Sequence, residues 1–250
     1  MLLATPAPPS QYLPSHGGPL GISAMPARHP LQSPVTAAFA GHWQTFAEHH
    51  GTARCLPKDI GAFASLGGTA PQDTDDFVRL VKRRHAPVIL LQTDEIAIPK
   101  ALEQVHRTEG VQMVLQVPIG EVPEYDVIEL SAVDAPEMLE LARLTKPGPF
   151  EINTRRLGRF IGIREGGVLA AMAGQRMAFP GWTEISGVSV HPDHRGQGLA
   201  RLLVRLMVAQ IESEGAKPFL HTYINNEPAI ALYESLGFAI RAKVNIAVVA

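Results

Sequence analysis

A polar loop with two glycines, between a predicted strand and a predicted helix, constrains this chain more than any other segment. The strand covers residues 184–190, the loop contains Gly196 and Gly198, and a strongly apolar helix follows as far as Gly215. Glycines let backbone N–H groups converge, and the first turn of a helix adds unpaired N–H groups and a partial positive charge. The segment therefore predicts a cradle for a phosphate or pyrophosphate group.

The spacing of the loop identifies the kind of phosphate ligand. A Walker loop needs Gly-Lys-Ser/Thr, which is absent here, and a dinucleotide fingerprint needs a third glycine where Arg201 stands. Arg195-x-x-Gly198-x-Ala200 instead resembles the Arg/Gln-x-x-Gly-x-Gly/Ala motif of the GNAT superfamily. Residues 226–238, NEPAIALYESLGF, resemble the late helix of that superfamily, Asn-x-x-Ala-x-x-Leu-Tyr-x-x-x-Gly-Phe. On these two blocks, the chain is identified as a member over about residues 125–250.

The resemblance implies the fold class and the domain organisation. It implies an α+β fold with a mixed, mostly antiparallel sheet that is splayed at an acetyl-CoA cleft and flanked by helices. Residues 121–250 form this GNAT N-acetyltransferase domain, and 31–120 form a smaller α/β lobe that resembles the degenerate GNAT-like half of longer members. That lobe would cover one side of the acceptor cleft. The Pro-rich residues 1–30 predict a disordered leader, because proline removes backbone donors.

Hydrophobic periodicity predicts the individual elements. The first lobe is expected to contain helices over 34–47 and 73–82 and strands over 88–91 and 111–117. In the second domain we expect helices over 136–144, 198–214 and 227–236, and strands over 125–130, 160–163, 168–172, 184–190, 217–223, 238–241 and 244–249.

The resemblance also implies which residues bind acetyl-CoA. Backbone groups of Val188 and Val190 would pair with pantetheine, and main-chain N–H groups of 195–201 would hold the pyrophosphate. Asn226 either hydrogen-bonds pantetheine or caps its helix. The complete predicted set is Val188, Ser189, Val190, Arg195, Gly196, Gln197, Gly198, Leu199, Ala200, Arg201 and Asn226.

Two residues are predicted to be catalytic. Tyr233 stands where the family commonly keeps a tyrosine near the CoA sulfur, and its phenol would hydrogen-bond or protonate the leaving thiolate. Glu184 is four residues before Val188, so regular alternation would give both side chains the same face. A glutamate at this position accepts the amine proton in some branches of the family. A core tyrosine and a solvated strand carboxylate are the alternative interpretations.

Composition and the remaining polar residues exclude several partners. A net charge of -2 gives no positive field for nucleic acid or an anionic membrane, and no apolar run approaches the roughly 20 residues that span a bilayer. The single cysteine, Cys55, excludes an internal disulfide and fits a reducing compartment. His191 and His194 have no identifiable third ligand, so we predict no metal. We expect a cytoplasmic protein.

The sequence leaves more than one class of function open. The resemblance implies an acyltransferase that moves the acetyl group of acetyl-CoA to a primary amine of a small molecule or peptide, by direct attack in a ternary complex. A protein lysine or N-terminal acetyltransferase is the nearest alternative, and a catalytically silent acyl-CoA-binding regulatory module is the alternative from another class. The sequence does not name the acceptor, because acceptor choice depends on variable surface around the cleft. It also leaves the oligomeric state open, a homodimer included.

Overall fold

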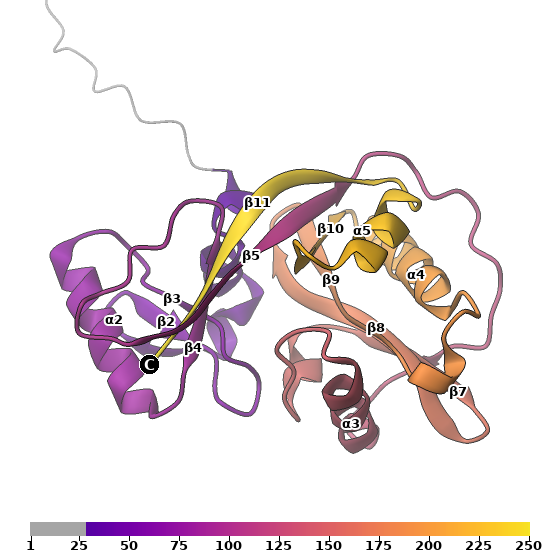
Figure 1. Cartoon of the computed structure of the whole chain (residues 1–250), viewed down its shortest axis with the longest axis horizontal. Coiled ribbons are helices and arrows are strands. Elements are labelled where there is room, and N and C mark those ends of the chain that lie inside the picture. The colour runs from indigo at the N-terminus through magenta and orange to yellow at the C-terminus, as the bar shows by residue number, and fades with distance from the viewer. Residues whose placement is uncertain (1–28) are drawn as a thin grey trace, which may run out of the picture.

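A computed structural model describes residues 29–250 (Figure 1), so residues 1–28 of the predicted leader lie outside the described part of the chain. The described residues form an eight-stranded sheet in the order β4-β11-β5-β10-β9-β8-β7-β6 and a three-stranded sheet, β1-β2-β3. The helices are α1 (Pro34–Ala40), α2 (Pro71–Arg84), α3 (Ala135–Thr145), α4 (Leu199–Ser213) and α5 (Glu227–Glu234). The strands are β1 (Glu48–His50), β2 (Ala53–Cys55), β3 (Ala64–Ser65), β4 (Val88–Gln92), β5 (Gln104–Leu115), β6 (Ile128–Glu129), β7 (Phe160–Glu165), β8 (Val168–Phe179), β9 (Trp182–Val190), β10 (Lys217–Tyr223) and β11 (Phe238–Val249).

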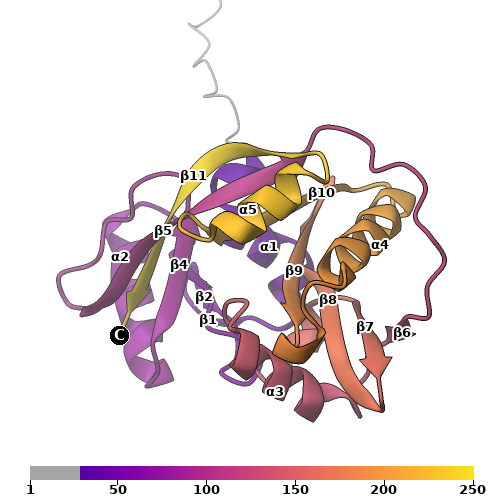
Figure 2. The ribbon, with the colours of Figure 1, turned by 45° about the vertical axis from the view of Figure 1, so that its right-hand side comes forward.

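The predicted α+β class with a mixed, mostly antiparallel sheet is confirmed. Strands β9 and β10 are parallel, and every other adjacent pair in the large sheet is antiparallel. Helix α4 packs along β8 and β9, and α5 packs beside β11 (Figure 2). The apolar stripe of α4 is fully buried in this interface, with Leu203, Val204 and Val208 at 0% exposure. The helix that begins at the predicted cradle is therefore fixed to the sheet by its core packing.

Strand β5 joins the predicted first lobe to the rest of the sheet. It lies between β10 and β11, with Met113 opposite both Leu220 and Ile240. The long strands β5 and β11 continue together toward β4 and α2, where β11 pairs with β4 (Figure 1). The predicted boundary near residue 120 therefore separates strands that are hydrogen-bonded neighbours. The domain division itself stays a prediction.

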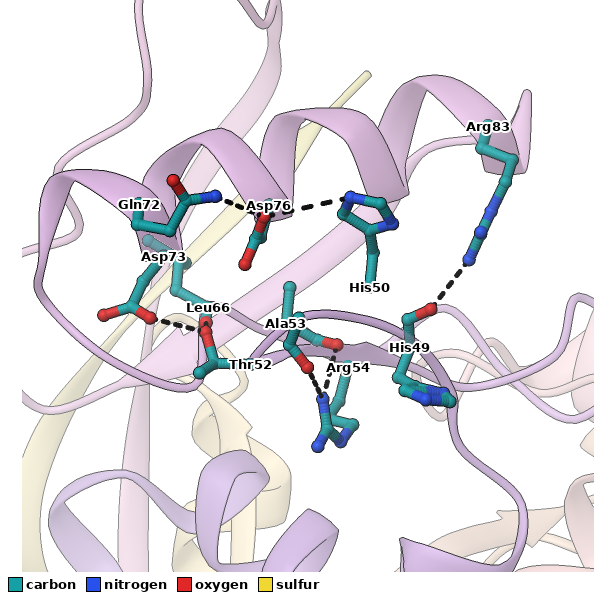
Figure 3. Close-up of polar contacts among 11 residues, drawn as sticks. His49, His50, Thr52, Ala53, Arg54, Leu66, Gln72, Asp73, Asp76 and Arg83 are labelled. Atoms are coloured by element: carbon teal, nitrogen blue, oxygen red, sulfur yellow. Dashed lines mark hydrogen bonds and ion pairs between the residues drawn. The ribbon is translucent and has the colours of Figure 1, made fainter.

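The small sheet β1-β2-β3 packs on α2 through a polar seam (Figure 3). Asp76 on α2 accepts a hydrogen bond from Gln72 at 2.8 Å, and His50 on β1 lies 3.8 Å from the same carboxylate. At one end of the seam the Thr52 hydroxyl donates to Asp73 at 2.6 Å, and at the other Arg83 donates to the carbonyl of His49 at 2.8 Å. These contacts fix the β1–β2 hairpin to α2.

Several predicted elements have other bounds in the structure: the strand predicted over 111–117 is β5, that over 168–172 is the longer β8, and that over 125–130 is only β6. Two further differences have a local cause. The helix expected over 34–47 ends at Ala40, because Gly41 leaves the helical conformation and a short 3₁₀ turn (His42–Thr45) follows. The two C-terminal strands are one continuous strand, β11, because a local register shift between Ile240 and Ala242 absorbs the irregularity without ending the pairing with β5.

Gly187 marks the point where the sheet opens. Parallel pairing between β9 and β10 runs from Lys217 opposite Trp182 to Leu220 opposite Ile185, and stops there. Gly187 has φ of +66°, a conformation that glycine adopts without strain. An added Cβ at this position would lie 2.9 Å from the Phe160 ring. The predicted splay between these two parallel strands is thus present, and the β10-facing edge of β9 after Ile185 pairs with no strand of the described chain.

Candidate acetyl-CoA and acceptor site

A cavity of about 520 Å³ opens at the splay. One part of its wall comes from the end of β9, the start of α4 and the facing side of α5. Another part comes from β4, β5 and β11. Residues 145–149, at the end of α3 and in the loop after it, complete the wall with Phe63, Arg176 of β8 and residues 221–223 of β10. Both predicted lobes therefore contribute to a single cavity.

Most residues predicted from the motifs lie together in this wall. The lining includes Val188, Ser189, Val190, Arg195, Gly196, Gly198, Leu199, Ala200, Arg201, Asn226 and Tyr233. Gln197 and Glu184 are the two predicted site residues that do not line the cavity. The individual binding and catalytic roles of the lining residues stay predictions.

The loop before α4 has the geometry of an anion cradle. Gly196 and Gly198 have φ of +77° and +78°, and an added Cβ at either would meet no atom within 4 Å. Gly198 is the N-cap of α4, and no side chain accepts a hydrogen bond from its first turn. The N–H groups of that turn have no partner inside the helix and carry its positive dipole end. These open, unpaired donors fit a pyrophosphate.

Asn226 has a structural role in addition to the predicted one. Its side-chain oxygen accepts a hydrogen bond from the N–H of Ala229 at 3.4 Å, so it caps α5. Capping uses one lone pair of the amide oxygen and leaves the amide NH₂ group free for a second partner. Both interpretations drawn from the sequence are therefore compatible with this geometry.

Glu184 is not positioned as the sequence predicted. The Gly187 bulge breaks the alternation of β9: Ile185 and Val188 pack in the same apolar cluster although three positions separate them. Glu184 consequently points to the other face and is 0% exposed. Its carboxylate accepts hydrogen bonds from Arg176 at 2.8 and 2.9 Å and contacts His221 Nδ1 at 2.8 Å.

This pairing decides the charge of Glu184. Burial by itself raises the pKa of the carboxyl group, but the charge and hydrogen bonds of Arg176, together with the hydrogen bond from His221, outweigh burial and lower the pKa from 4.5 to about 2. A carboxylate this acidic, with both oxygens occupied, is a poor acceptor for a proton from an amine. The expectation that it accepts the amine proton directly is therefore unsupported by the geometry.

His221 and Arg176 are cavity residues that the motifs did not indicate. The Arg241 guanidinium donates to Gln112 Oε1 at 2.9 Å, which orients the amide so that its NH₂ group faces the carbonyl of Leu31 and His221 Nε2, both at 3.0 Å. Since the amide nitrogen only donates, His221 Nε2 accepts and its Nδ1–H donates to Glu184. The sequence did contain one signal for this cluster. Arg176 is a charged residue within the apolar run of β8, and a buried charge needs a partner.

Tyr233 is buried in the wall formed by α5, with 7% exposure. Burial raises the pKa of its phenol to about 12, so the hydroxyl stays protonated through the neutral range. A thiol has a pKa of about 8.5, and complete proton transfer from this phenol to a thiolate is therefore uphill. The arrangement suits a phenol that donates a hydrogen bond to a thiolate.

Residues 29–250 also bear on the predicted membrane and metal partners. No helix in this range has the length and apolar character needed to cross a bilayer. No cluster of three or more His, Cys, Asp or Glu side chains in it has the arrangement of a metal site.

Comparison with known proteins agrees with the geometry of this cavity. Residues 160–246 match the family described as FR47-like protein. A crystal structure of a GNAT-family acetyltransferase from Novosphingobium aromaticivorans is 34% identical, with a TM-score of 0.80 over 89% of this chain and 98% of that one. The fold is shared with a GCN5-related N-acetyltransferase from Kribbella flavida, at 19% identity and a TM-score of 0.57 over 88% of this chain and 96% of that one.

A curated relative is similar over a shorter segment. The [ribosomal protein bS18]-alanine N-acetyltransferase of Escherichia coli K12 is 36% identical over 77 residues, which are 30% of this chain. The match spans about half of that relative, 51% of its length. The fold and the named relatives together define this protein as an acetyltransferase. With near-complete coverage of the Novosphingobium protein, the chain belongs to the GNAT family of acetyltransferases.

Proposed function

We propose that this protein is an N-acetyltransferase that moves the acetyl group of acetyl-CoA to a primary amine of a small molecule or peptide, by direct attack in a ternary complex. The observation that carries the proposal is the single cavity in which the α4 cradle, the unpaired edge of β9 and Tyr233 face a wall built by β4, β5 and β11. A cavity with one wall for the cofactor and another for an acceptor suits a reaction that needs both bound at once.

We assign a role in this reaction to each of the main cavity residues. The N–H groups at the start of α4 hold the pyrophosphate, and backbone groups of Val188 and Val190 pair with pantetheine. When bound, acetyl-CoA supplies an electrophilic thioester. The Tyr233 phenol donates a hydrogen bond to the departing sulfur. Glu184 acts as a positioning residue that holds Arg176 and His221, and the amine proton leaves through water in the cavity.

The cradle is tested by Gly198→Asp, with Gly198→Asn as its matched control. Both side chains tolerate a left-handed N-cap, but only aspartate places a negative charge beside the phosphates. Like charges at such a contact cost several kcal/mol, so we expect acetyl-CoA affinity to fall roughly 100-fold or more in Gly198→Asp. The asparagine variant should retain most of the affinity in isothermal titration calorimetry. Equal affinities for both variants would locate the phosphates elsewhere.

The phenol is tested by Tyr233→Phe. This change removes only the hydroxyl, and we expect kcat to fall roughly 10²-fold while the Kd for acetyl-CoA changes little, because the interaction strengthens as charge develops on sulfur. Release of free thiol with an accepted amine measures kcat. Tyr125→Phe, an exposed tyrosine outside the cavity, is the control and should match the parent. An unchanged kcat in Tyr233→Phe would remove this residue from the chemistry.

A protein N-terminus is a second candidate acceptor. It is favoured by the similarity to the E. coli enzyme, whose name states that it acetylates an alanine of ribosomal protein bS18. Assays with short peptides and free amines, under the same conditions, separate this candidate from a small-molecule acceptor.

A further inference from the structure

The acceptor wall of the cavity is an ordered patch of side chains on one face of three strands. On β11, Ile246 and Val248 are two positions apart and therefore point to the same face. Ile246 is opposite Leu91 of β4 and Thr108 of β5, and Val248 is opposite Ile89 of β4 and His106 of β5. All six residues line the cavity. We name this patch the cross-strand platform: Ile89, Leu91, His106, Thr108, Ile246 and Val248.

The opposite face of the same strands is already covered. Val88, Leu90, Ala247 and Val249 alternate with the platform residues and are buried in the cluster that includes Phe77 and Leu80 of α2. Helix α2 lies beside these strands in Figure 1. The platform is the other face: Ile89, Leu91 and Ile246 also pack against the apolar cluster that contains Phe63, and all six side chains border the cavity. Four of its six side chains are aliphatic, and the two polar ones both belong to β5.

The charge of the cavity restricts which amines it accepts. Among the described residues that line it, none is Asp or Glu. The nearest buried carboxylate, Glu184, is already occupied by Arg176 and His221. Arg176 itself lies over the Phe63 ring at 4.8 Å, and Lys146 adds a positive charge to the wall. A cavity with these charges disfavours an acceptor that arrives with several positive charges.

We propose that the cross-strand platform binds a bulky apolar side chain next to a primary α-amine, so that the preferred acceptors are hydrophobic amino-acid derivatives or peptides that begin with such a residue. This inference rests on the proposed function and specifies its substrate class. An α-amine has a pKa of about 7.7–8.0, against about 10.4 for a lysine side chain. It is therefore substantially neutral near pH 8 and enters without a carboxylate partner, whereas a lysine side chain or a polyamine does not.

The test measures thiol release from acetyl-CoA with matched acceptors. Leucine amide and alanine amide differ in the side chain alone; spermidine and Nα-acetyl-lysine amide provide the strongly basic amines. A methylene in an apolar pocket is worth about 10-fold or more in kcat/KM, so we expect leucine amide to exceed alanine amide at least 10-fold and the basic amines to react more slowly still. Free leucine and a tripeptide that begins with leucine are also compared, to show whether the acceptor is an amino acid or a peptide.

Variants connect the preference to the platform. Val248→Thr keeps the shape of the side chain and adds a hydroxyl, and it should raise KM for leucine amide several-fold without changing acetyl-CoA affinity. Thr108→Val extends the apolar surface and should lower that KM. Val105→Thr, at an exposed position of β5 outside the cavity, is the control. Misfolding cannot lower KM, so the decrease in KM expected for Thr108→Val distinguishes an effect of the platform from a folding defect.

The outcomes separate this inference from the proposed function. If thiol is released best with spermidine or the lysine amide, and Val248→Thr and Thr108→Val leave KM unchanged, the enzyme is an acetyltransferase and the platform inference is wrong. If acetyl-CoA binds but no amine is acetylated, the proposed function fails, and the platform inference fails with it.

Discussion

A chain shortened to residues 121–250 is expected to lose acceptor turnover completely and to aggregate. The cut removes β4 and β5, and β5 is the strand that joins β10 to β11 in the sheet. With β5 absent, β11 loses both of its partner strands, and β10 exposes a row of unpaired N–H and C=O groups. Apolar side chains of β11 such as Val244, which is 0% exposed in the full chain, would meet water.

Size-exclusion chromatography and the thiol-release assay measure this outcome. A chain that begins at residue 29 is the matched control, since it keeps every described residue, and it should match the full chain in melting temperature and turnover. The shortened chain keeps the Gly198 cradle, so any soluble fraction is expected to bind acetyl-CoA weakly while failing to acetylate amines. A monomeric 121–250 fragment with full activity would show that the two predicted lobes are independent.

The sequence predicted the cofactor side of the site well because that side is local. The cradle needs a strand end, two glycines and a helix start in succession, and Gly196, Gly198 and Tyr233 all line the same cavity. The fold class followed from the same two motifs. Hydrophobic periodicity located the long elements, whereas the end of the first helix depended on the backbone that Gly41 adopts.

The acceptor side could not be predicted because it depends on pairing between distant strands. Thr108 and Ile246 become neighbours only through the register of β5 with β11. The error at Glu184 has a similar origin: regular alternation gives it the same face as Val188, and the bulge at Gly187 reverses that face. A period-two rule holds only along an uninterrupted strand, and a glycine in a strand interior is a signal that the rule can fail.

Arg176→Met is expected to destabilise the protein more than any other single substitution in this site. Methionine keeps the contact with the Phe63 ring but leaves the Glu184 carboxylate buried without its guanidinium partner. Removing one member of a buried ion pair costs about 3–5 kcal/mol, because the remaining charge is uncompensated. Urea denaturation should therefore give a lower free energy of unfolding by about that amount.

The double variant Arg176→Met/Glu184→Gln tests the physical cause of that loss. Glutamine has no charge, and its side-chain oxygen still accepts a hydrogen bond from His221 Nδ1. The double variant should recover most of the stability, which a loss from packing alone would not allow.

The pH dependence of the free energy of unfolding gives a second readout. The pKa of Glu184 is lowered by folding, so its contribution is complete above pH 4.5 and is lost as the pH falls toward 2. Glu184→Gln should flatten the stability curve in that window, and an unchanged curve would mean that the buried pair does not stabilise the fold.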